Sequence, residues 1–213
     1  MSDAENARCE HRNSLLAISD SLPTMFAELW LVRHGETEWS RSRKHTGLTD
    51  IALTAQGERD AKNLQPRLQP HTFSKVFCSP LQRARQTCEL AGFAGAFELD
   101  ENLLEWNYGE YEGLLTTEIR ERHPGWNAFE HGCPGGENLR DVATRAERFI
   151  EKVRSIEGNV LAFAHRDILR VISALWIGLP ARAAQRLYMD PASISRLGYD
   201  HSLQEPILRT LNT

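Results

Sequence analysis

Short, uninterrupted runs of apolar residues alternate with longer amphipathic stretches along most of the chain. The apolar runs are too short for a typical helix, and polar or turn-forming residues bound each of them, which indicates buried strands. The two runs nearest the C-terminus alternate apolar and polar positions, as strands at the edge of a sheet do. The predicted strands cover residues 28–32, 75–78, 96–99, 159–164, 194–199 and 207–211.

Amphipathic segments between these strands predict helices. The predicted helices run from Thr54 to near Pro66 or Pro70, from Pro80 in a first-turn position to Gly92, from 139 to about 156, and from 168 to 177. Alternation of helices with apolar strands predicts an α/β fold. We expect three layers, α/β/α, around a mostly parallel central sheet with an antiparallel edge strand.

The first 27 residues differ from the rest of the chain. They carry several acidic residues, which argue against a mitochondrial presequence, and their apolar run, 15–18, is too short for the core of a signal peptide. We therefore predict a disordered N-terminal extension over residues 1–27, followed by a single domain over residues 28–213.

The composition limits the classes of partner. A chain of 213 residues, 41% of them hydrophobic, is long enough for one sizeable core. A net charge of -4 predicts no binding to nucleic acid or to an anionic membrane, and no apolar run reaches the roughly 18 residues that span a bilayer. The four cysteines lack the spacing of zinc ligands, so we expect no metal, no cofactor and a reducing, cytoplasmic environment. The pattern leaves the oligomeric state open.

Two predicted strands end at a histidine, one at Arg33-His34 and the other at His165. Ligands of α/β sheets bind at the carboxyl ends of the strands, so we expect the two imidazoles to lie together. Another strand is followed by Arg83 near the start of a helix, where a cation opposes the helix dipole but suits a bound dianion. Nearby guanidinium groups should keep His34 neutral, with its second ring nitrogen held by a backbone carbonyl.

A neutral His34 beside these cations could accept a phosphoryl group covalently. Such a transfer would also need a proton donor for the leaving oxygen. Glu105 follows two leucines and precedes Trp106, so we expect desolvation to raise its pKa. Glu110 and Glu112 lie among turn residues and are expected to be solvated.

Four motifs occur along the chain in this order: L-V-R-H-G-E-T-E-W, T-G-L-T-D-I-A-L-T-A-Q-G-E, S-P-L-Q-R-A-R-Q-T and E-W-N-Y-G-E-Y-E-G. Together they resemble the histidine phosphatase superfamily, the phosphoglycerate mutase-like enzymes, and the similarity covers residue 28 to about 211. H-T-G-L-T-D and W-x-x-x-x-x-G-C-P-G-G-E most resemble the sugar-bisphosphatase branch of this superfamily, which includes sedoheptulose-1,7-bisphosphatase.

This resemblance implies a metal-independent phosphatase that hydrolyses a small phosphorylated metabolite, a sugar phosphate or bisphosphate, through a phosphohistidine. It implies His34 as the phosphoryl acceptor and Glu105 as the proton donor and then the base for water. Phosphate ligands would be Arg33, Arg83 and His165. Further substrate contacts are implied for Ser40, where many relatives have Asn, and for Thr46, Gly47, Tyr108, Arg166 and Arg170.

The chain departs from the superfamily pattern at Arg166, because Gly usually follows the second histidine. Arg166 could strain the backbone and shift His165, add a cation for a second phosphate, or pair with Asp167. Two other functions stay open: a phosphoglycerate mutase-type transfer and, because of Arg166, a weakly active phosphate-binding regulatory protein. The short segment 113–135 favours the phosphatase, because the mutase branch generally carries a longer insertion there.

Overall fold

The computed structural model describes residues 26–213, which form a six-stranded sheet in the order β3-β2-β4-β1-β5-β6. The first four strands in this order are parallel to one another, β5 pairs antiparallel with β1, and β6 pairs antiparallel with β5. The strands are β1 (Leu29–Arg33), β2 (Lys75–Cys78), β3 (Glu98–Leu99), β4 (Val160–Ala164), β5 (Ile194–Tyr199) and β6 (Pro206–Thr210). The predicted mostly parallel sheet with an antiparallel edge is therefore confirmed.

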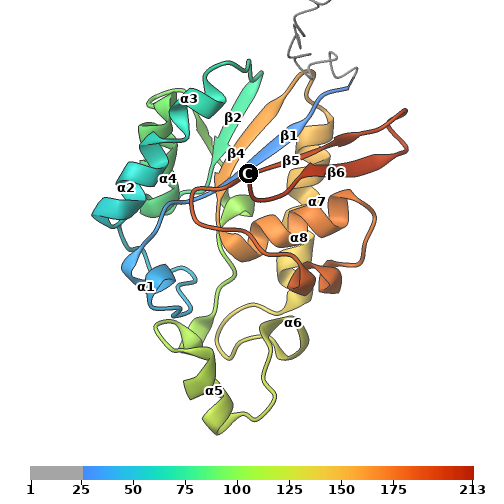
Figure 1. Cartoon of the computed structure of the whole chain (residues 1–213). Coiled ribbons are helices and arrows are strands. Elements are labelled where there is room, and N and C mark those ends of the chain that lie inside the picture. Colours follow the sequence, from blue (N-terminus) through green and yellow to red (C-terminus); the bar gives the residue numbers. More distant parts are fainter. Residues whose placement is uncertain (1–25) are drawn as a thin grey trace, which may run out of the picture.

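Helices cover both faces of this sheet (Figure 1), with α2, α3 and α4 on one side and α7 and α8 on the other. The α-helices are α1 (Glu38–Arg41), α2 (Ala55–Lys62), α3 (Gln65–Leu68), α4 (Gln82–Cys88), α5 (Thr116–Arg122), α6 (Ala128–His131), α7 (Leu139–Arg154) and α8 (Arg166–Trp176). Short segments of other helix types lie at Glu89–Phe93, Glu101–Leu103, Gly109–Tyr111 and Ala181–Arg186.

Strands β1 and β4 and most of β2 are buried on both faces, which explains their uninterrupted hydrophobic runs, whereas β3 is shorter than predicted and exposed. In β1, Leu29 and Leu31 join the core under α7 and α8, whereas Trp30 and Val32 join the core under α2, α3 and α4. Alternate side chains of a strand point to opposite faces, so one run of residues supplies both cores.

Two of the predicted helices differ in their ends. Thr54 caps α2 as predicted, accepting from the Gly57 N–H at 3.0 Å, but α2 ends at Lys62, and Pro66 lies in the separate α3. Pro80 precedes Leu81, the N-cap residue of α4, and so lies outside the first turn. Gly92, with a φ of 99°, ends the helical run after α4 as predicted.

Helix α8 begins at Arg166, two residues before its predicted start, with His165 as the N-cap residue. The prediction rested on the apolar repeat that starts at Ile168, and the polar first turn does not show that repeat. The first turn therefore belongs to the edge of the sheet where the two histidines lie.

A lobe built from α1, α5 and α6 lies beyond the carboxyl ends of β1 and β4 (Figure 1). Stacked and edge-to-face aromatic rings form its interior, including Tyr111 with Trp126 and Trp106 with Phe129, each pair 5.1 Å apart between centroids. Its helices have two turns or fewer, too short for a clear apolar repeat, and the sequence did not predict them.

Most of the predicted N-terminal extension, residues 1–25, lies outside the described residues. Phe26 belongs to the described fold, because its ring packs on Tyr199 with centroids 6.1 Å apart. Across residues 26–213, no helix combines the length and the apolar character needed to cross a membrane.

Candidate active site

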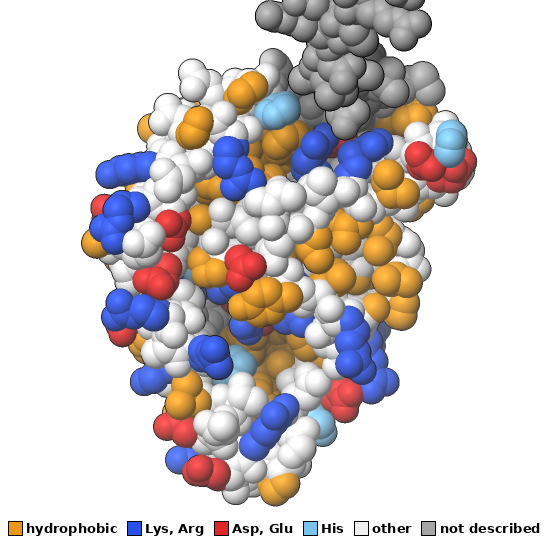
Figure 2. Space-filling view, viewed as in Figure 1, with side chains coloured by type: hydrophobic (Ala, Val, Ile, Leu, Met, Phe, Trp, Pro, Cys, Tyr) orange, Lys and Arg blue, Asp and Glu red, His pale blue; other side chains and the backbone are white. Residues whose placement is uncertain are grey.

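A cavity of about 490 Å³ opens at the carboxyl ends of β1 and β4, between the sheet and the lobe of α1, α5 and α6. Figure 2 shows a hollowed region there, with Lys, Arg and His side chains at its edge. The cavity is lined by Arg33, His34, Ser40, Arg41, Arg43, Lys44, His45, Thr46, Arg83, Glu105, Tyr108, Thr116, Arg166, Asp167, Tyr188 and Pro191.

The structure brings the two predicted histidines together, with the ring centroids of His34 and His165 5.1 Å apart. His34 Nδ1 lies 2.7 Å from the Gly35 carbonyl oxygen. A carbonyl can only accept a hydrogen bond, so the proton is on Nδ1 and Nε2 keeps its lone pair. His34 is buried but lines the cavity.

His165 is fully buried behind these groups and does not line the cavity. Arg83 Nε donates to His165 Nδ1 at 3.1 Å, so the ring proton is on Nε2, which donates to Ser79 Oγ at 2.7 Å. Both ring nitrogens are therefore used within the protein. The sequence predicted direct phosphate contact by His165, whereas in this structure His165 forms a hydrogen bond with Arg83. The contact of Ser79 with the His165 ring was not predicted.

Burial lowers the pKa of both histidines well below the usual value, and the nearby Arg83 and Arg33 lower it further. Both rings are therefore neutral around neutral pH, as the sequence predicted for His34. A neutral His34 with a free Nε2 lone pair is a nucleophile.

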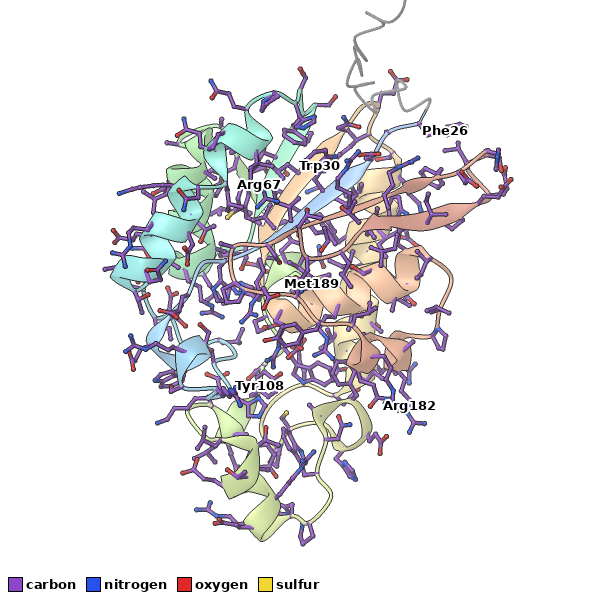
Figure 3. The ribbon with its side chains drawn as sticks, in the orientation of Figure 1. Phe26, Trp30, Arg67, Tyr108, Arg182 and Met189 are labelled. Carbon is purple, nitrogen blue, oxygen red and sulfur yellow. The ribbon has the colours of Figure 1, made fainter. Side chains whose placement is uncertain are left out.

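Two guanidinium groups are fixed beside His34. Arg33 donates from Nη1 to the Met189 carbonyl oxygen at 2.6 Å, and its buried Nε has no partner within residues 26–213. Figure 3 marks Met189 on the segment that leads into β5. Burial lowers the pKa of Arg33 and of Arg83 to about 10, so both remain charged at neutral pH.

Arg83 is held by the segment that contains the predicted Thr46 and Gly47. Its guanidinium donates to the carbonyl oxygens of Gly47 at 2.8 Å and Thr49 at 3.1 Å. Thr46 lines the cavity, but Gly47 does not, and Gly47 acts through its carbonyl on Arg83. Gly47 has a φ of 57°, and a Cβ there would overlap the Glu112 carboxylate.

Glu112 is half-buried and fixed by hydrogen bonds, rather than fully solvated as predicted. Its carboxylate accepts from the backbone N–H groups of Leu48 and Thr49 at 2.7 and 2.8 Å, and from the Thr49 hydroxyl. These bonds fix the loop whose carbonyl oxygens hold Arg83. The long-range contact, between residues 63 or more positions apart, leaves no local signal in the sequence.

Glu105 is buried at the N-terminus of α8 and lines the cavity. Its Oε1 accepts from the backbone N–H groups of Trp106 at 3.0 Å and of Asp167 and Ile168, both at 3.2 Å. Burial, and then the charge of Asp167, raise its pKa above the usual value, as the sequence predicted from desolvation. A carboxyl with a raised pKa can donate a proton near neutral pH.

Asp167 is a second buried carboxylate beside Glu105. It accepts from the Tyr108 hydroxyl, from Arg166 Nε at 3.2 Å and from Arg170 Nη1 at 2.5 Å. Burial alone would raise its pKa, but Arg166 and Arg170 outweigh burial and hold the pKa well below its usual range. Asp167 is therefore charged.

Two predicted substrate contacts, Tyr108 and Arg170, bind Asp167 in this structure. Tyr108 lines the main cavity but its hydroxyl donates a hydrogen bond to Asp167, and Figure 3 shows it between the sheet and α5. Arg170 lines a smaller neighbouring hollow of about 220 Å³ rather than the main cavity. This hollow shares residues such as His45 and Arg166 with the main cavity.

Arg166 is the first residue of α8 and is not among the residues with positive φ. The backbone strain considered for this position is therefore absent. Arg166 pairs with Asp167, as considered, and it also lines the cavity, where binding of a second phosphate stays a prediction.

Ser40 lines the cavity as predicted, and its hydroxyl also completes the capping box of α1 with Thr37. The sequence reasoning missed the cations that follow it. The signal was the basic run R-S-R-K over 41–44, directly before the T-G-L-T-D motif. His45 was also missed; its ring packs on Tyr108 with centroids 4.4 Å apart, and burial lowers its pKa to about 4.

Within residues 26–213, one group of side chains could hold a metal ion by geometry: Asp200, His201 and Glu205 on the exposed turn between β5 and β6. None of them lines the cavity. Exposed acidic groups of this kind are common without an ion, so the group defines no site.

At the carboxyl ends of these strands, a neutral histidine with a free ring nitrogen lies beside two buried guanidinium groups, an arrangement that suits phosphoryl transfer. The chain belongs to the histidine phosphatase superfamily (branch 1), whose family model matches residues 29–212. The resemblance found in the sequence is therefore confirmed, and the chain is a hydrolase of the phosphatase type.

Several proteins of this superfamily are similar over most of the chain. An acid phosphatase of Mycobacterium tuberculosis is 36% identical over 83% of this chain and 89% of its own length. The sedoheptulose 1,7-bisphosphatase of Saccharomyces cerevisiae is 35% identical over 74% of this chain and 70% of its own. The solved structure of the open reading frame Rv3214 from Mycobacterium tuberculosis superposes with a TM-score of 0.81 at 35% identity, covering 87% of this chain and 97% of that chain.

Proposed function

We propose that the protein hydrolyses a small phosphomonoester in two steps through a phosphohistidine at His34. The observation that carries the proposal is the hydrogen bond from His34 Nδ1 to the Gly35 carbonyl oxygen, 2.7 Å long. This bond fixes the tautomer and leaves the Nε2 lone pair available in a cavity with Arg33 and Arg83 beside it.

In the first step, His34 Nε2 attacks phosphorus, and the bond from phosphorus to the leaving oxygen breaks. Arg33 and Arg83 neutralise the phosphoryl oxygens as charge redistributes, and Glu105 gives its proton to the leaving oxygen. The unpartnered Nε–H of Arg33 is a donor available for this purpose.

In the second step, the Glu105 carboxylate takes a proton from water, and the water oxygen attacks the phosphohistidine. The bond from Nε2 to phosphorus breaks, inorganic phosphate leaves, and the lone pair of His34 is restored. His165 acts through its hydrogen bond with Arg83 and keeps that guanidinium oriented throughout.

The proposed substrate class is a sugar phosphate or sugar bisphosphate. Two observations support it: the cavity has the volume of a small-ligand pocket, and a relative bears the name sedoheptulose 1,7-bisphosphatase. The cationic lining favours a substrate with high negative charge.

The test is a hydrolysis screen over phosphorylated sugars, glycerates and nucleotides with the wild-type protein, His34→Ala and His201→Ala. His201 is exposed on the turn between β5 and β6, so it is a matched control for the loss of an imidazole. We expect His34→Ala to reduce turnover to background and His201→Ala to match the wild type. Turnover by His34→Ala at the wild-type rate would refute the proposal.

A mutase would use the same phosphohistidine but return the phosphoryl group to the substrate. Incubation of 3-phosphoglycerate with and without 2,3-bisphosphoglycerate separates the two reactions. The proposed phosphatase releases inorganic phosphate, whereas rapid isomerisation without phosphate release would identify a mutase.

A further inference from the structure

Three cationic side chains lie at the mouth of the cavity: Arg41, the last residue of α1, and Arg43 and Lys44, which follow α1. All three are exposed, whereas Arg33 and Arg83 are buried beside His34. The cavity therefore has two separate groups of cations. We call the segment 41–44 the rim.

Backbone hydrogen bonds hold the rim in place. Lys44 N–H donates to the Trp39 carbonyl oxygen at 2.9 Å, and Lys44 forms an isolated antiparallel bridge with Leu115. The backbone N–H of the next residue, His45, donates to the Leu114 carbonyl oxygen at 2.9 Å. These bonds tie the rim to the chain that precedes α5, so its side chains are presented from a fixed backbone.

Arg43 occupies a backbone conformation that favours glycine or asparagine. Its φ is 62°, in the left-handed region, where a residue with a long side chain is uncommon. The side chain lines the cavity mouth, so the chain keeps a cation at a position where glycine would be less strained.

The charges lining the cavity do not balance within residues 26–213. Six cationic side chains face two carboxyl groups: Arg33, Arg41, Arg43, Lys44, Arg83 and Arg166 against Glu105 and Asp167. Arg41 pairs with Glu38 and Arg166 with Asp167. Neither Arg43 nor Lys44 has an acidic partner within the described part of the chain.

One phosphoryl group at His34 would engage Arg33 and Arg83 and leave Arg43 and Lys44 without an anionic partner within the described residues. A second anion held at the mouth, on the same molecule, would pair with them. Since the chain carries a net charge of -4, the surplus of cations is a local feature of this cavity.

We infer that the rim, through Arg43 and Lys44, binds a second anionic group of the substrate, a phosphate or a carboxylate distant from the phosphoryl group that is transferred. This inference rests on the proposed function for the position of the transferred group. It adds a specificity site: the preferred substrates are phosphate esters with two separated anionic groups.

The experiment measures inhibition of p-nitrophenyl phosphate hydrolysis by matched sugar phosphates. Fructose 1,6-bisphosphate is compared with fructose 1-phosphate and fructose 6-phosphate, and 6-phosphogluconate supplies a distant carboxylate in place of the second phosphate. The readout is the ratio of the inhibition constant of the better monophosphate to that of each doubly anionic compound.

The test variant is Arg43→Gly with Lys44→Ala. Glycine suits the φ of position 43, so the variant removes both charges without adding backbone strain. Lys62→Ala is the control, because Lys62 is an exposed cation in the last turn of α2 and does not line the cavity. We expect the wild-type ratio to exceed one and Lys62→Ala to leave it unchanged. In the double variant the ratio should fall about tenfold, because two exposed charge pairs are lost.

The doubly anionic compound whose ratio falls identifies the group that the rim binds. A wild-type ratio of one, or a ratio that the double variant leaves unchanged for both doubly anionic compounds, would overturn the inference. Calorimetric binding of the same compounds to His34→Ala gives the ratio without turnover. Hydrolysis that depends on His34 while the ratio stays at one would refute the rim and leave the proposed function standing.

Discussion

Replacing Arg166 by glycine tests whether this residue weakens or supports the site. The guanidinium lies 3.2 Å from Asp167 and is 35% exposed, so solvent screens the pair and its loss costs up to about 1 kcal/mol. A glycine in the first turn of α8 costs up to about 1 kcal/mol more in backbone entropy. The free energy of unfolding should therefore fall by up to about 2 kcal/mol.

For a chain of this length, that loss lowers the melting temperature by up to about 8 °C, which circular dichroism can follow. Arg166→Gly also removes a cation from the cavity lining and loosens Asp167, so we expect kcat/KM for p-nitrophenyl phosphate to fall about tenfold, the equivalent of roughly 1.4 kcal/mol. Arg166→Lys keeps a cation at this position and should lose less activity.

The opposite outcome has a clear meaning. If Arg166→Gly raised the rate sharply, Arg166 would be an obstacle to turnover, and the protein would be a weakly active regulatory phosphate-binding protein. The absence of positive φ at Arg166 and its ion pair with Asp167 are the reasons that we expect the rate to fall.

Four further predictions concern the support of the site and its independence of metal ions. Asp167→Asn removes the charge that raises the pKa of Glu105, so the basic limb of the pH profile of kcat/KM should move to lower pH; a profile that stays in place would contradict this coupling. Arg166 and Arg170 lower the pKa of Asp167 in the folded state. The Asp167 carboxylate therefore stabilises the fold above its unfolded pKa of about 3.9, and this contribution is lost as the pH falls. The melting temperatures of Asp167→Asn and the wild type should therefore converge in acid. Gly57→Ala would place a Cβ 2.7 Å from the Glu36 backbone nitrogen. The free energy of unfolding, measured in urea, should therefore fall by about 1–3 kcal/mol. An unchanged urea midpoint would show that α2 can move away from the loop that follows His34. A chelator should leave the rate unchanged, and a loss that added metal restores would contradict a metal-independent reaction.

The sheet and the meeting of the two histidines could be predicted because they follow from local patterns. Strands buried on both faces leave uninterrupted apolar runs, and two of these runs end at His34 and His165. Because β1 and β4 are parallel neighbours, their carboxyl ends place both residues at one edge.

The role of His165 could not be predicted in the same way. Its ring nitrogens are occupied by Arg83 and Ser79, which are 82 and 86 residues away in the sequence. The polar first turn of α8, which carries Arg166 and Asp167, also lacks the apolar repeat that revealed the rest of the helix.

The lobe and the rim depend on contacts between distant segments. The short helices α5 and α6 are stabilised by aromatic packing such as Tyr111 on Trp126 rather than by a long amphipathic repeat. Glu112 looked like a surface residue because only the folded loop brings the N–H groups of Leu48 and Thr49 to its carboxylate. Tertiary structure, rather than local sequence, assigns these residues their contacts.

Trapping of the covalent intermediate tests the central claim most directly. The wild-type protein is mixed briefly with a substrate found in the screen, quenched in base, in which phosphohistidine is stable, and digested for mass spectrometry. We predict a phosphoryl group on His34 that acid removes and that His34→Ala lacks. Turnover with no phosphoryl group on His34, or an equal level of labelling in His34→Ala, would contradict the account.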